Sequence, residues 1–275
     1  MNKNKVVLFA NARNEINIKE WAAHHLLIGF DNIIIFDHRS DVPLKKIFTN
    51  FDKRVKIINC SFLQNPIKML LMNYALRLAR KMQVEWLIYL DCDEFLFFNK
   101  QMGVKKLLER FPHADSVSIN WLVFGSNHFV KDPEGLIIDN YIKSEKILDP
   151  HVKSFVRISQ ALGAVNPHYY DIKNSSRMYN VTNTRMSAPY CFFPNKLPYN
   201  SVLAYIGHYI NQSEETYIRR KLLLPEDDTG SIRQIENLQI IHNTGNKVNN
   251  LFPKTKYSEN IKLFIKQFED EDKKK

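Results

Sequence analysis

The pattern of apolar and polar residues divides the chain into a regular first part and a less regular second part. In the first part, short apolar runs bounded by polar residues predict buried strands at 6–10, 32–36, 54–59 and 86–90. Amphipathic stretches predict a helix that ends near Gly29 and a second helix from about Pro66 to Met82. Strands and helices that alternate in this way predict a layered α/β fold with a mostly parallel central sheet.

Both helices carry local signals of where they begin and which side they bury. Asn17, followed three residues later by Glu20, fits a capping box at the start of the first helix. His24 and His25 are adjacent and cannot share one helical face, so we interpret both as structural. The second helix repeats apolar residues at i, i+3, i+4 and i+7. That spacing predicts a buried face made of Ile67, Leu70, Leu71, Tyr74, Ala75, Leu78 and Met82.

Three acidic residues, Asp91, Asp93 and Glu94, directly follow the apolar run at 86–90. Buried carboxylates are costly to desolvate unless a positive group meets them, and a hard divalent cation is a natural partner for oxygen ligands. In an extended chain Asp91 and Asp93 point to one side and Cys92 to the other. Because ligands of open α/β sheets bind at the carboxyl ends of strands, we predict a metal and ligand site here. The structural alternative is a turn that caps the next helix.

Beyond residue 100 the predicted elements are less regular. The pattern predicts helices at 103–111, 213–224 and around 261–268, and strands at 116–124, 153–158 and 203–209. The strand at 116–124 alternates polar and apolar residues, which is typical of a half-exposed strand. We expect the charged stretch 131–150 to be a mobile loop. The stretch 166–198, rich in Pro, Asn, Ser and Tyr, predicts irregular structure that covers the site.

The composition is that of an ordinary globular protein with an excess of positive charge. The 275 residues carry a formal net charge of +10, which favours acidic partners such as nucleotide diphosphates, nucleic acid or anionic lipids. Part of the excess is the terminal run 273–275, where contact with an anionic membrane surface is an alternative to simple solvation. Cys60, Cys92 and Cys191 form no C-x-x-C pair, which favours a reducing compartment. The pattern contains no signal peptide or transmembrane segment, so we expect a cytoplasmic protein.

Taken in order, these motifs resemble inverting glycosyltransferases of the GT-A fold, close to families 2 and 92. The residues that carry the resemblance are Ala10-Asn11-Ala12-Arg13-Asn14-Glu15, Asp37 with Ser40-Asp41, Asp91-Cys92-Asp93-Glu94-Phe95 as a "DxDEF" motif, Trp121 with Phe124-Gly125-Ser126, Lys153-Ser154-Phe155-Val156-Arg157, and His208-Tyr209 with Ser213-Glu214-Glu215. The resemblance implies a GT-A-like (Rossmann-like) transferase domain at 1–225 and a C-terminal extension at 226–275. Within the domain it implies a nucleotide-sugar-binding half at 1–100 and an acceptor-binding half at 101–225.

The resemblance also implies a chemistry for this site. A sugar would pass from a nucleotide diphosphate donor, with a UDP-sugar favoured, to a hydroxyl of a glycan, lipid-linked or protein acceptor. Mn²⁺ or Mg²⁺ would bridge the diphosphate and would be held by Asp93, Asp91 and His208, with His168 a weaker candidate. The residues implied in donor binding are Ala10, Asn11, Arg13, Glu15, Asp37 at the nucleobase, Lys68, Asp91 and Arg157, with Lys153 as a further positive group.

The residues expected nearest the reaction are Asp91, Asp93 and Glu94. An inverting mechanism also needs a carboxylate that deprotonates the acceptor hydroxyl. That base stays unassigned because the family 2 Glu-Asp motif is missing from the stretch where it would be expected. Asp132, Glu134 and Asp149 are weak candidates in that stretch.

Three other functions remain open from the sequence. A haloacid-dehalogenase-like phosphohydrolase would use Asp91 as nucleophile and Asp93 as general acid, although its motif normally follows the first strand. A basic module that binds nucleic acid or glycans without catalysis would need clustered basic and exposed aromatic residues, and we do not expect a nucleic-acid partner. A degenerate transferase that serves as a scaffold is disfavoured by the intact Asp91 and Asp93.

Overall fold

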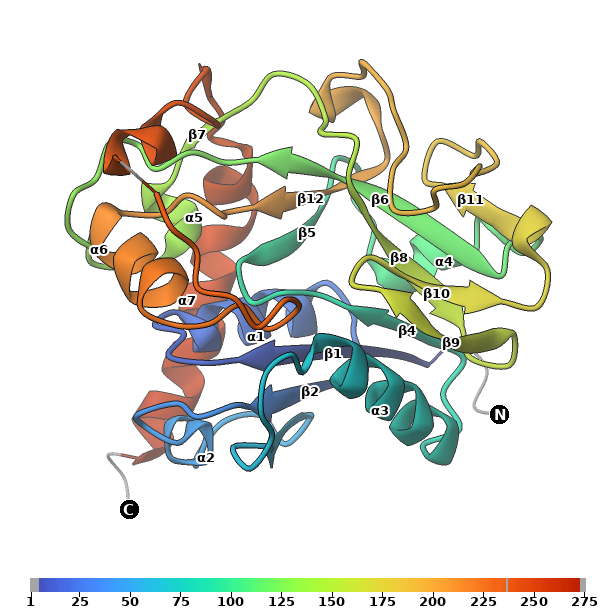
Figure 1. Cartoon of the computed structure of the whole chain (residues 1–275), viewed down its shortest axis with the longest axis horizontal. Coiled ribbons are helices and arrows are strands. Elements are labelled where there is room, and N and C mark those ends of the chain that lie inside the picture. The colour runs from blue at the N-terminus through green and yellow to red at the C-terminus, as the bar shows by residue number, and fades with distance from the viewer. Residues whose placement is uncertain (1–4, 236, 273–275) are drawn as a thin grey trace.

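The structure, a computed structural model, describes residues 5–235 and 237–272, so the basic run 273–275 lies outside the described residues. Within the described part, nine strands form one sheet in the order β3-β2-β1-β4-β8-β6-β12-β5, with β11 paired to β6 (Figure 1). The strands are β1 (Val6–Ala12), β2 (Asn32–Asp37), β3 (Val55–Asn59), β4 (Trp86–Tyr89), β5 (Glu94–Phe98), β6 (Ser116–Val123), β8 (Val152–Arg157), β11 (Met178–Asn180) and β12 (Ala204–His208).

The sheet is mostly parallel, as the sequence predicts. The strands β3, β2, β1 and β4 run parallel to one another, and both β12 and β11 run parallel to β6. The antiparallel pairs are β4 with β8, β8 with β6, and β5 with β12. The α/β fold class is therefore confirmed.

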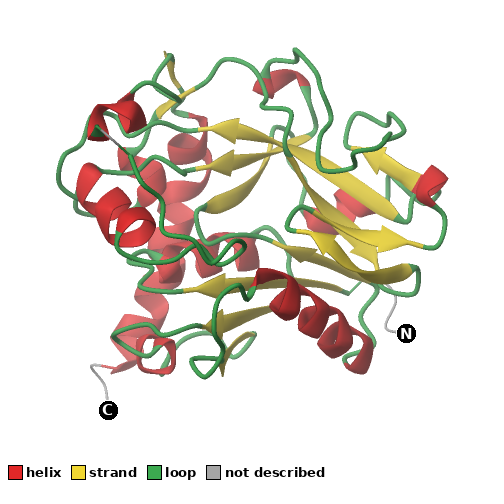
Figure 2. Cartoon of the chain, viewed as in Figure 1, coloured by secondary structure: helices red, strands yellow, loops and turns green. Residues whose placement is uncertain are grey.

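Helices cover both faces of this sheet (Figure 2). On one face α3 packs against β1 and β4, while on the other α1 packs against β5 and α7 packs against α1. The helices are α1 (Ile18–Leu27), α2 (Leu44–Ile47), α3 (Lys68–Lys81), α4 (Val104–Leu108), α5 (Ile137–Asn140), α6 (Glu214–Tyr217) and α7 (Phe252–Asp272), and the short strands outside the sheet are β7 (Lys143–Ser144), β9 (Ala161–Asn166), β10 (Tyr169–Ile172) and β13 (Val248–Asn249). None of the described helices combines the length and apolar character that crossing a bilayer requires.

The register of the parallel strands brings their carboxyl ends to one edge of the sheet. Phe9 of β1 pairs with Tyr89 of β4, and Ala12 of β1 pairs with Asp37 of β2. The residues that follow these positions therefore meet at the same edge, where open α/β sheets bind their ligands. This edge holds the candidate site.

The first helix begins where the sequence predicts, but the capping box does not form. The side chain of Asn17 makes no capping hydrogen bond. The carboxylate of Glu20 instead accepts hydrogen bonds from the N–H groups of Ile137 and Ile138 at 2.7 and 3.1 Å. The tertiary contact with α5 thus replaces the local cap.

His24 and His25 are structural, as predicted. Both are buried, and His24 Nε2 lies 2.8 Å from the carbonyl of Leu96 while His25 Nδ1 lies 2.8 Å from the carbonyl of Trp21. Burial lowers the pKa of His24 to about 4. The two rings are therefore neutral packing groups of α1.

The buried face of α3 is rotated relative to the prediction. Leu70 and Tyr74 are exposed, whereas Met72, Leu76 and Ala79 are buried with the predicted residues Leu71 and Ala75. Leu70 and Tyr74 lie on the solvent side of the helix because the sheet contacts its next row of residues. Apolar spacing predicted the helix but not its orientation.

Three predictions for the second part are wrong in detail. The strand β6 is buried along most of its length because β8 and β12 flank it, and its polar residues bond within the sheet, as Ser118 does with Ser154 at 2.8 Å. The stretch 131–150 contains α5 and β7 rather than a loop alone. The stretch 166–198 includes β10 and β11.

Candidate active site

A cavity of about 280 Å³ lies at the carboxyl ends of β1 and β4. Its floor comes from these strand ends and from the first turn of α3, and its cover comes from the chain after β12. The lining residues include Asn11, Arg13, Glu15, Lys68, Asp91, Asp93, Trp121, Lys153, His168, His208, Arg220, Lys221, Asp227, Asp228 and Arg233. The cavity is thus lined mainly by charged groups of both signs.

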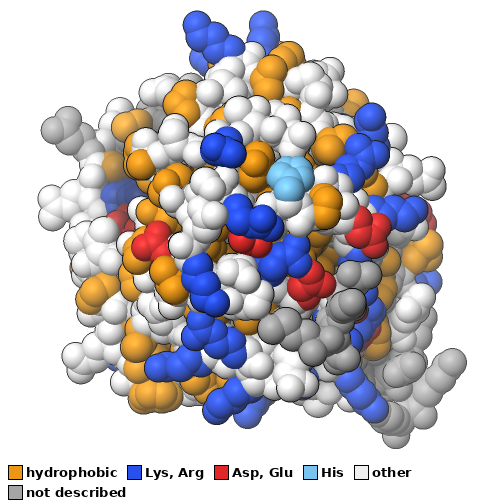
Figure 3. Space-filling model, turned by 90° about the vertical axis from the view of Figure 1, so that its right-hand side faces the viewer, with side chains coloured by type: hydrophobic (Ala, Val, Ile, Leu, Met, Phe, Trp, Pro, Cys, Tyr) orange, Lys and Arg blue, Asp and Glu red, His pale blue; other side chains and the backbone are white. Residues whose placement is uncertain are grey.

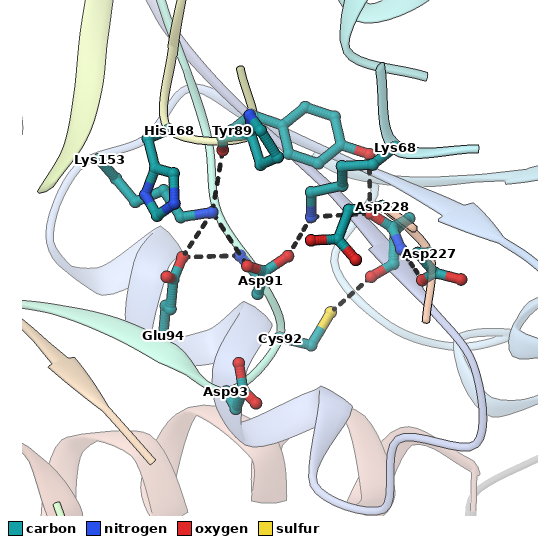
Figure 4. A network of polar contacts seen from close by, with 12 residues as sticks. Lys68, Tyr89, Asp91, Cys92, Asp93, Glu94, Lys153, His168, Asp227 and Asp228 are labelled. Carbon is teal, nitrogen blue, oxygen red and sulfur yellow. Dashed lines mark hydrogen bonds and ion pairs between the residues drawn. The ribbon is translucent and has the colours of Figure 1, made fainter. Parts of the chain in front are cut away.

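Asp91 is held by two buried lysines (Figure 4). Lys68 Nζ pairs with one carboxylate oxygen of Asp91, and Lys153 Nζ lies 2.9 Å from the other. Burial alone would raise the pKa of Asp91, but Lys153 and Lys68 outweigh it and hold the pKa well below its usual value. The Asp91 side chain remains 36% exposed, so an ionised carboxylate faces the cavity.

Asp91, Cys92 and Asp93 lie in a turn between β4 and β5 rather than in extended chain. The predicted alternation is therefore wrong, and the two aspartates meet different partners. Asp93 is 2% exposed and lies 3.4 Å from Arg220 Nη2 and 3.7 Å from His208 Nε2. Burial alone would raise the pKa of Asp93. The nearby cations, Arg220 foremost, outweigh burial and hold the pKa below its usual value.

The side chain of Glu94 stabilises this turn through a hydrogen bond to its backbone. Its side chain is fully buried, and Oε2 accepts the backbone N–H of Asp91 at 2.8 Å and lies 3.6 Å from Lys153 Nζ. Burial raises the pKa of Glu94 to about 8. Because Glu94 does not line the cavity, its position suits a supporting group rather than one that contacts a substrate.

Arg220 is a site residue that the sequence interpretation missed. It belongs to a short π-helical stretch, Ile218–Leu222, and joins the chain after β12 to the strand ends. Arg220 Nη2 lies 2.8 Å from Glu15 as well as near Asp93. Burial raises the pKa of Glu15 to about 7 despite this cation. The run of basic residues 219–221 in a predicted helix was the available signal, but such a run is more often solvated.

The cover of the cavity comes from residues 210–233, not from 166–198 as predicted. The backbone carbonyl of Asp227 accepts the N–H groups of Ile67 and Lys68, both at 2.8 Å, at the start of α3. Arg13 donates to the carbonyl of Pro225 at 2.6 Å, and Asn11 donates to the carboxylate of Asp227. From the predicted cover only residues 167 and 168 line the cavity.

Most of the predicted site residues meet in this cavity. The structure brings together Asn11, Arg13, Glu15, Lys68, Asp91, Asp93, Lys153, His168 and His208. Ala10 is buried inside the sheet. Asp37 is buried beside the cavity, where its Oδ2 accepts the N–H of Leu44 at 2.8 Å and its Oδ1 has no partner among the described residues.

Arg157 is not brought to the cavity. Its guanidinium lies 4.3 Å from the ring centre of Trp86 and pairs with Asp115 at 3.5 Å, at the opposite end of β4. That end is on the right in Figure 1 and faces the viewer in Figure 3, where basic and acidic side chains lie next to one another. The antiparallel direction of β8 explains the displacement, because β8 carries Lys153 near the cavity and Arg157 away from it.

The three acidic residues predicted as candidates for the catalytic base do not line the cavity. Asp132 accepts hydrogen bonds from the hydroxyls of Ser213 and Thr216 at the start of α6. Glu134 lies on the exposed surface. Asp149 pairs with His151, whose ring stacks on Trp121, a residue of the cavity lining.

The fit of a metal ion depends on a small set of donors. Among the residues described, no group of three or more His, Cys, Asp and Glu side chains is placed to hold a metal. Asp93 Oδ1 and His208 Nε2 lie 3.7 Å apart. Burial lowers the pKa of His208 to about 4, so its imidazole is neutral and able to act as a ligand. The pair suits an ion that takes its other ligands from a bound substrate.

No family model matches the sequence, and no curated protein matches it either. Among solved structures the chain is similar to S. aureus TarS 1-349 in complex with UDP, with 14% identity over 56% of this chain and 47% of that chain and a TM-score of 0.33. The TarS complex with UDP-GlcNAc gives 15% identity over 56% and 46%, with a TM-score of 0.31. HddC from Yersinia pseudotuberculosis gives 12% identity over 64% and 89%, with a TM-score of 0.35.

The chain spans about half the length of the TarS chains that it matches. At these scores the similarities assign no residue and no substrate.

Proposed function

We propose that this protein is a glycosyltransferase that moves a sugar from a nucleotide diphosphate-sugar donor to a hydroxyl acceptor, with inversion at the anomeric carbon. The observation that carries the proposal is the set of buried cations around the strand-end carboxylates, namely Lys68, Lys153 and Arg220. A leaving diphosphate concentrates negative charge as the glycosidic bond breaks. Cations that are already fixed in place stabilise that charge without reorganisation.

The proposal assigns the donor to the first part of the chain. Asn11 and Arg13 follow β1, Lys68 lies in the first turn of α3, and Asp91 follows β4. Trp121 and His168 from the later part line the other side of the cavity, which we assign to the acceptor. The domain boundary predicted at residue 225 stays a prediction.

In this proposal Asp93 and His208 would hold Mn²⁺ or Mg²⁺, and the ion would offset part of the charge on the leaving diphosphate. The chain's own groups have separate tasks. Lys68 and Lys153 fix the direction of Asp91, and Arg220 ties Asp93 to Glu15. A UDP-sugar is the donor that the family resemblance favours.

The experiment that tests the proposal is a thermal-shift panel of UDP, GDP, CDP, ADP and dTDP, each with and without Mn²⁺. A ligand that binds only the native state raises the melting temperature by mass action. We expect one diphosphate to raise it, and to do so more strongly with Mn²⁺. If none of them shifts the wild-type protein, the proposed function is wrong.

Asp93→Asn is the diagnostic variant in this panel, and Asp171→Asn is its matched control because Asp171 lies on β10, outside the cavity lining. Each shift is measured against the variant's own melting temperature, since loss of the Asp93 charge leaves Arg220 with one carboxylate fewer. We expect the Mn²⁺-dependent part of the shift to disappear in Asp93→Asn and to persist in Asp171→Asn. An unchanged Mn²⁺ effect in Asp93→Asn would remove the metal from the proposal.

A further inference from the structure

Transfer with inversion requires a base for the acceptor hydroxyl, and most of the acidic candidates do not reach the cavity. Glu94 is fully buried beneath the strand-end turn. Asp132 is occupied by hydroxyl groups at the start of α6. Asp149 differs from both because it binds the imidazole of His151, which stacks on the cavity-lining residue Trp121.

The two side chains form a hydrogen-bonded pair. Asp149 Oδ1 lies 2.7 Å from His151 Nδ1 and accepts the backbone N–H of His151 at 2.9 Å. Nδ1 therefore carries the hydrogen of the neutral ring, and Nε2 is left to accept a proton. The His151 side chain is 38% exposed, so a substrate can approach it.

The backbone holds this pair against β6. The N–H of Asp149 donates to the carbonyl of Trp121 at 2.8 Å, and the N–H of Trp121 donates to the carbonyl of His151 at 3.0 Å. The side-chain amide of Asn120 donates to the carbonyl of Asp149 at 2.9 Å. The imidazole is thus fixed before any substrate binds, which is what a positioned base requires.

Trp121 connects the pair to the cavity. Its ring stacks on His151 with centroids 5.0 Å apart and an interplanar angle of 18°, and its centroid lies 4.2 Å from that of the His208 ring. His168, which also lines the cavity, lies 5.6 Å from His151. An acceptor that packs against Trp121 and His168 would therefore lie next to the imidazole of His151.

We propose that His151 is the catalytic base of this site and that Asp149 is its positioning residue; this inference rests on the proposed function. The proton of the acceptor hydroxyl passes to His151 Nε2 while the acceptor oxygen forms its bond to the anomeric carbon. The bond between that carbon and the diphosphate oxygen breaks, and its electron pair leaves with the diphosphate. Asp149 stabilises the imidazolium that results.

The pH profile should report this proton transfer. The neutral imidazole is the form that accepts the proton, so kcat should fall toward acidic pH, which is the acid limb of the profile. The titratable groups that face His151 are Asp149 on its own segment and His168 from the loop between β9 and β10. Burial and the nearby Lys153 lower the pKa of His168 to about 4, so His168 stays neutral over this range.

The test measures release of nucleoside diphosphate from UDP-glucose, UDP-N-acetylglucosamine and GDP-mannose with Mn²⁺, with water as the acceptor. We expect His151→Ala to lower kcat about 100-fold or more and to lose the acid limb of the profile, with KM for the donor and the diphosphate thermal shift unchanged. Asp149→Asn should lower kcat by about 10-fold and move the acid limb. His113→Ala is the matched control. His113 is an exposed histidine that lies just before the first residue of β6, whereas Trp121 lies near the last.

The outcomes separate this inference from the proposed function. Wild-type kcat and an unchanged acid limb in His151→Ala would overturn the inference while the transferase proposal stands. Equal losses in His151→Ala and His113→Ala would also overturn it, because a histidine outside the site would then matter as much. Absence of both binding and turnover in the wild-type protein would overturn the proposed function and the inference together.

Discussion

Two of the regions that line the cavity are held in different ways. The strand-end region, residues 11–15, 68 and 91–94, follows regular strands and the first turn of a helix, and a ladder of backbone hydrogen bonds fixes its position. The covering region, residues 210–233, is a short helix, a π-helical stretch and turns. It is held largely by side chains of the strand-end region, such as Arg13 on the carbonyl of Pro225 and Glu15 on Arg220.

The difference shows how the charges of the site are balanced. At Asp91 and Asp93 the nearby cations outweigh burial and lower the pKa, whereas at Glu15 and Glu94 burial prevails and raises it. Glu20 in α1 accepts only backbone hydrogen bonds, and burial raises its pKa to about 8. The covering region therefore supplies part of the charge that keeps the strand-end region ionised.

The largest expected effect is on turnover by Asp93→Ala. Asp93 joins the two regions through Arg220 and also lies 3.7 Å from His208 of β12. We expect kcat with the nucleotide sugars above to fall by about 1000-fold or more, because the cation that would offset charge on the leaving diphosphate loses its carboxylate ligand. The far-UV circular dichroism spectrum should stay native. Full activity in this variant would end the strand-end site hypothesis.

The next effect concerns stability of the strand-end region. Lys153 is buried and pairs with both Asp91 and Glu94. Lys153→Met leaves two carboxylates with less compensation, and we expect the free energy of unfolding to fall by about 3 kcal/mol. Urea unfolding measures this loss. Lys221→Met, in the covering region, is the control and should change it by less than about 1 kcal/mol.

A smaller effect should appear in the pH dependence of stability through Glu20. Its folded pKa of about 8 lies above its usual value of 4.5, so the folded state binds the proton more tightly. The stability from this group is present in full below pH 4.5 and is lost as the pH rises to about 8. Glu20→Gln should remove a fall on the order of 5 kcal/mol between these limits. Identical slopes of unfolding free energy against pH in both proteins would contradict the assignment.

The smallest effect should follow from Asp227→Ala in the covering region. The Asp227 carboxylate accepts from Asn11 and lies 3.9 Å from Arg13. Its loss should lower the free energy of unfolding by about 1 kcal/mol and speed amide hydrogen exchange in residues 224–233. Amides of β1 and β4 should keep their exchange rates. Equal acceleration in both regions would show that they are one cooperative unit.

Local pattern was sufficient for the regular elements and for the strand-end carboxylates. Apolar runs predicted β1 to β4, the acidic group after β4 predicted a site, and the family resemblance added His208. These features depend on residues that are close in sequence, where burial and backbone geometry produce a periodic pattern of apolar residues. The same pattern did not predict which face of α3 is buried, because the exposed Leu70 and Tyr74 match the helical spacing as well as the buried residues do.

Long-range packing decided the rest of the site. Arg220 meets Asp93 across 127 positions of sequence, Arg157 is carried to the far end of the sheet by the direction of β8, and His151 stacks on Trp121 only because the segment after α5 returns to β6. None of these contacts has a periodic signal, since each depends on which segments the folded chain brings side by side. Charge type and spacing thus indicated what the site contains, while strand order and loop docking decided which groups meet there.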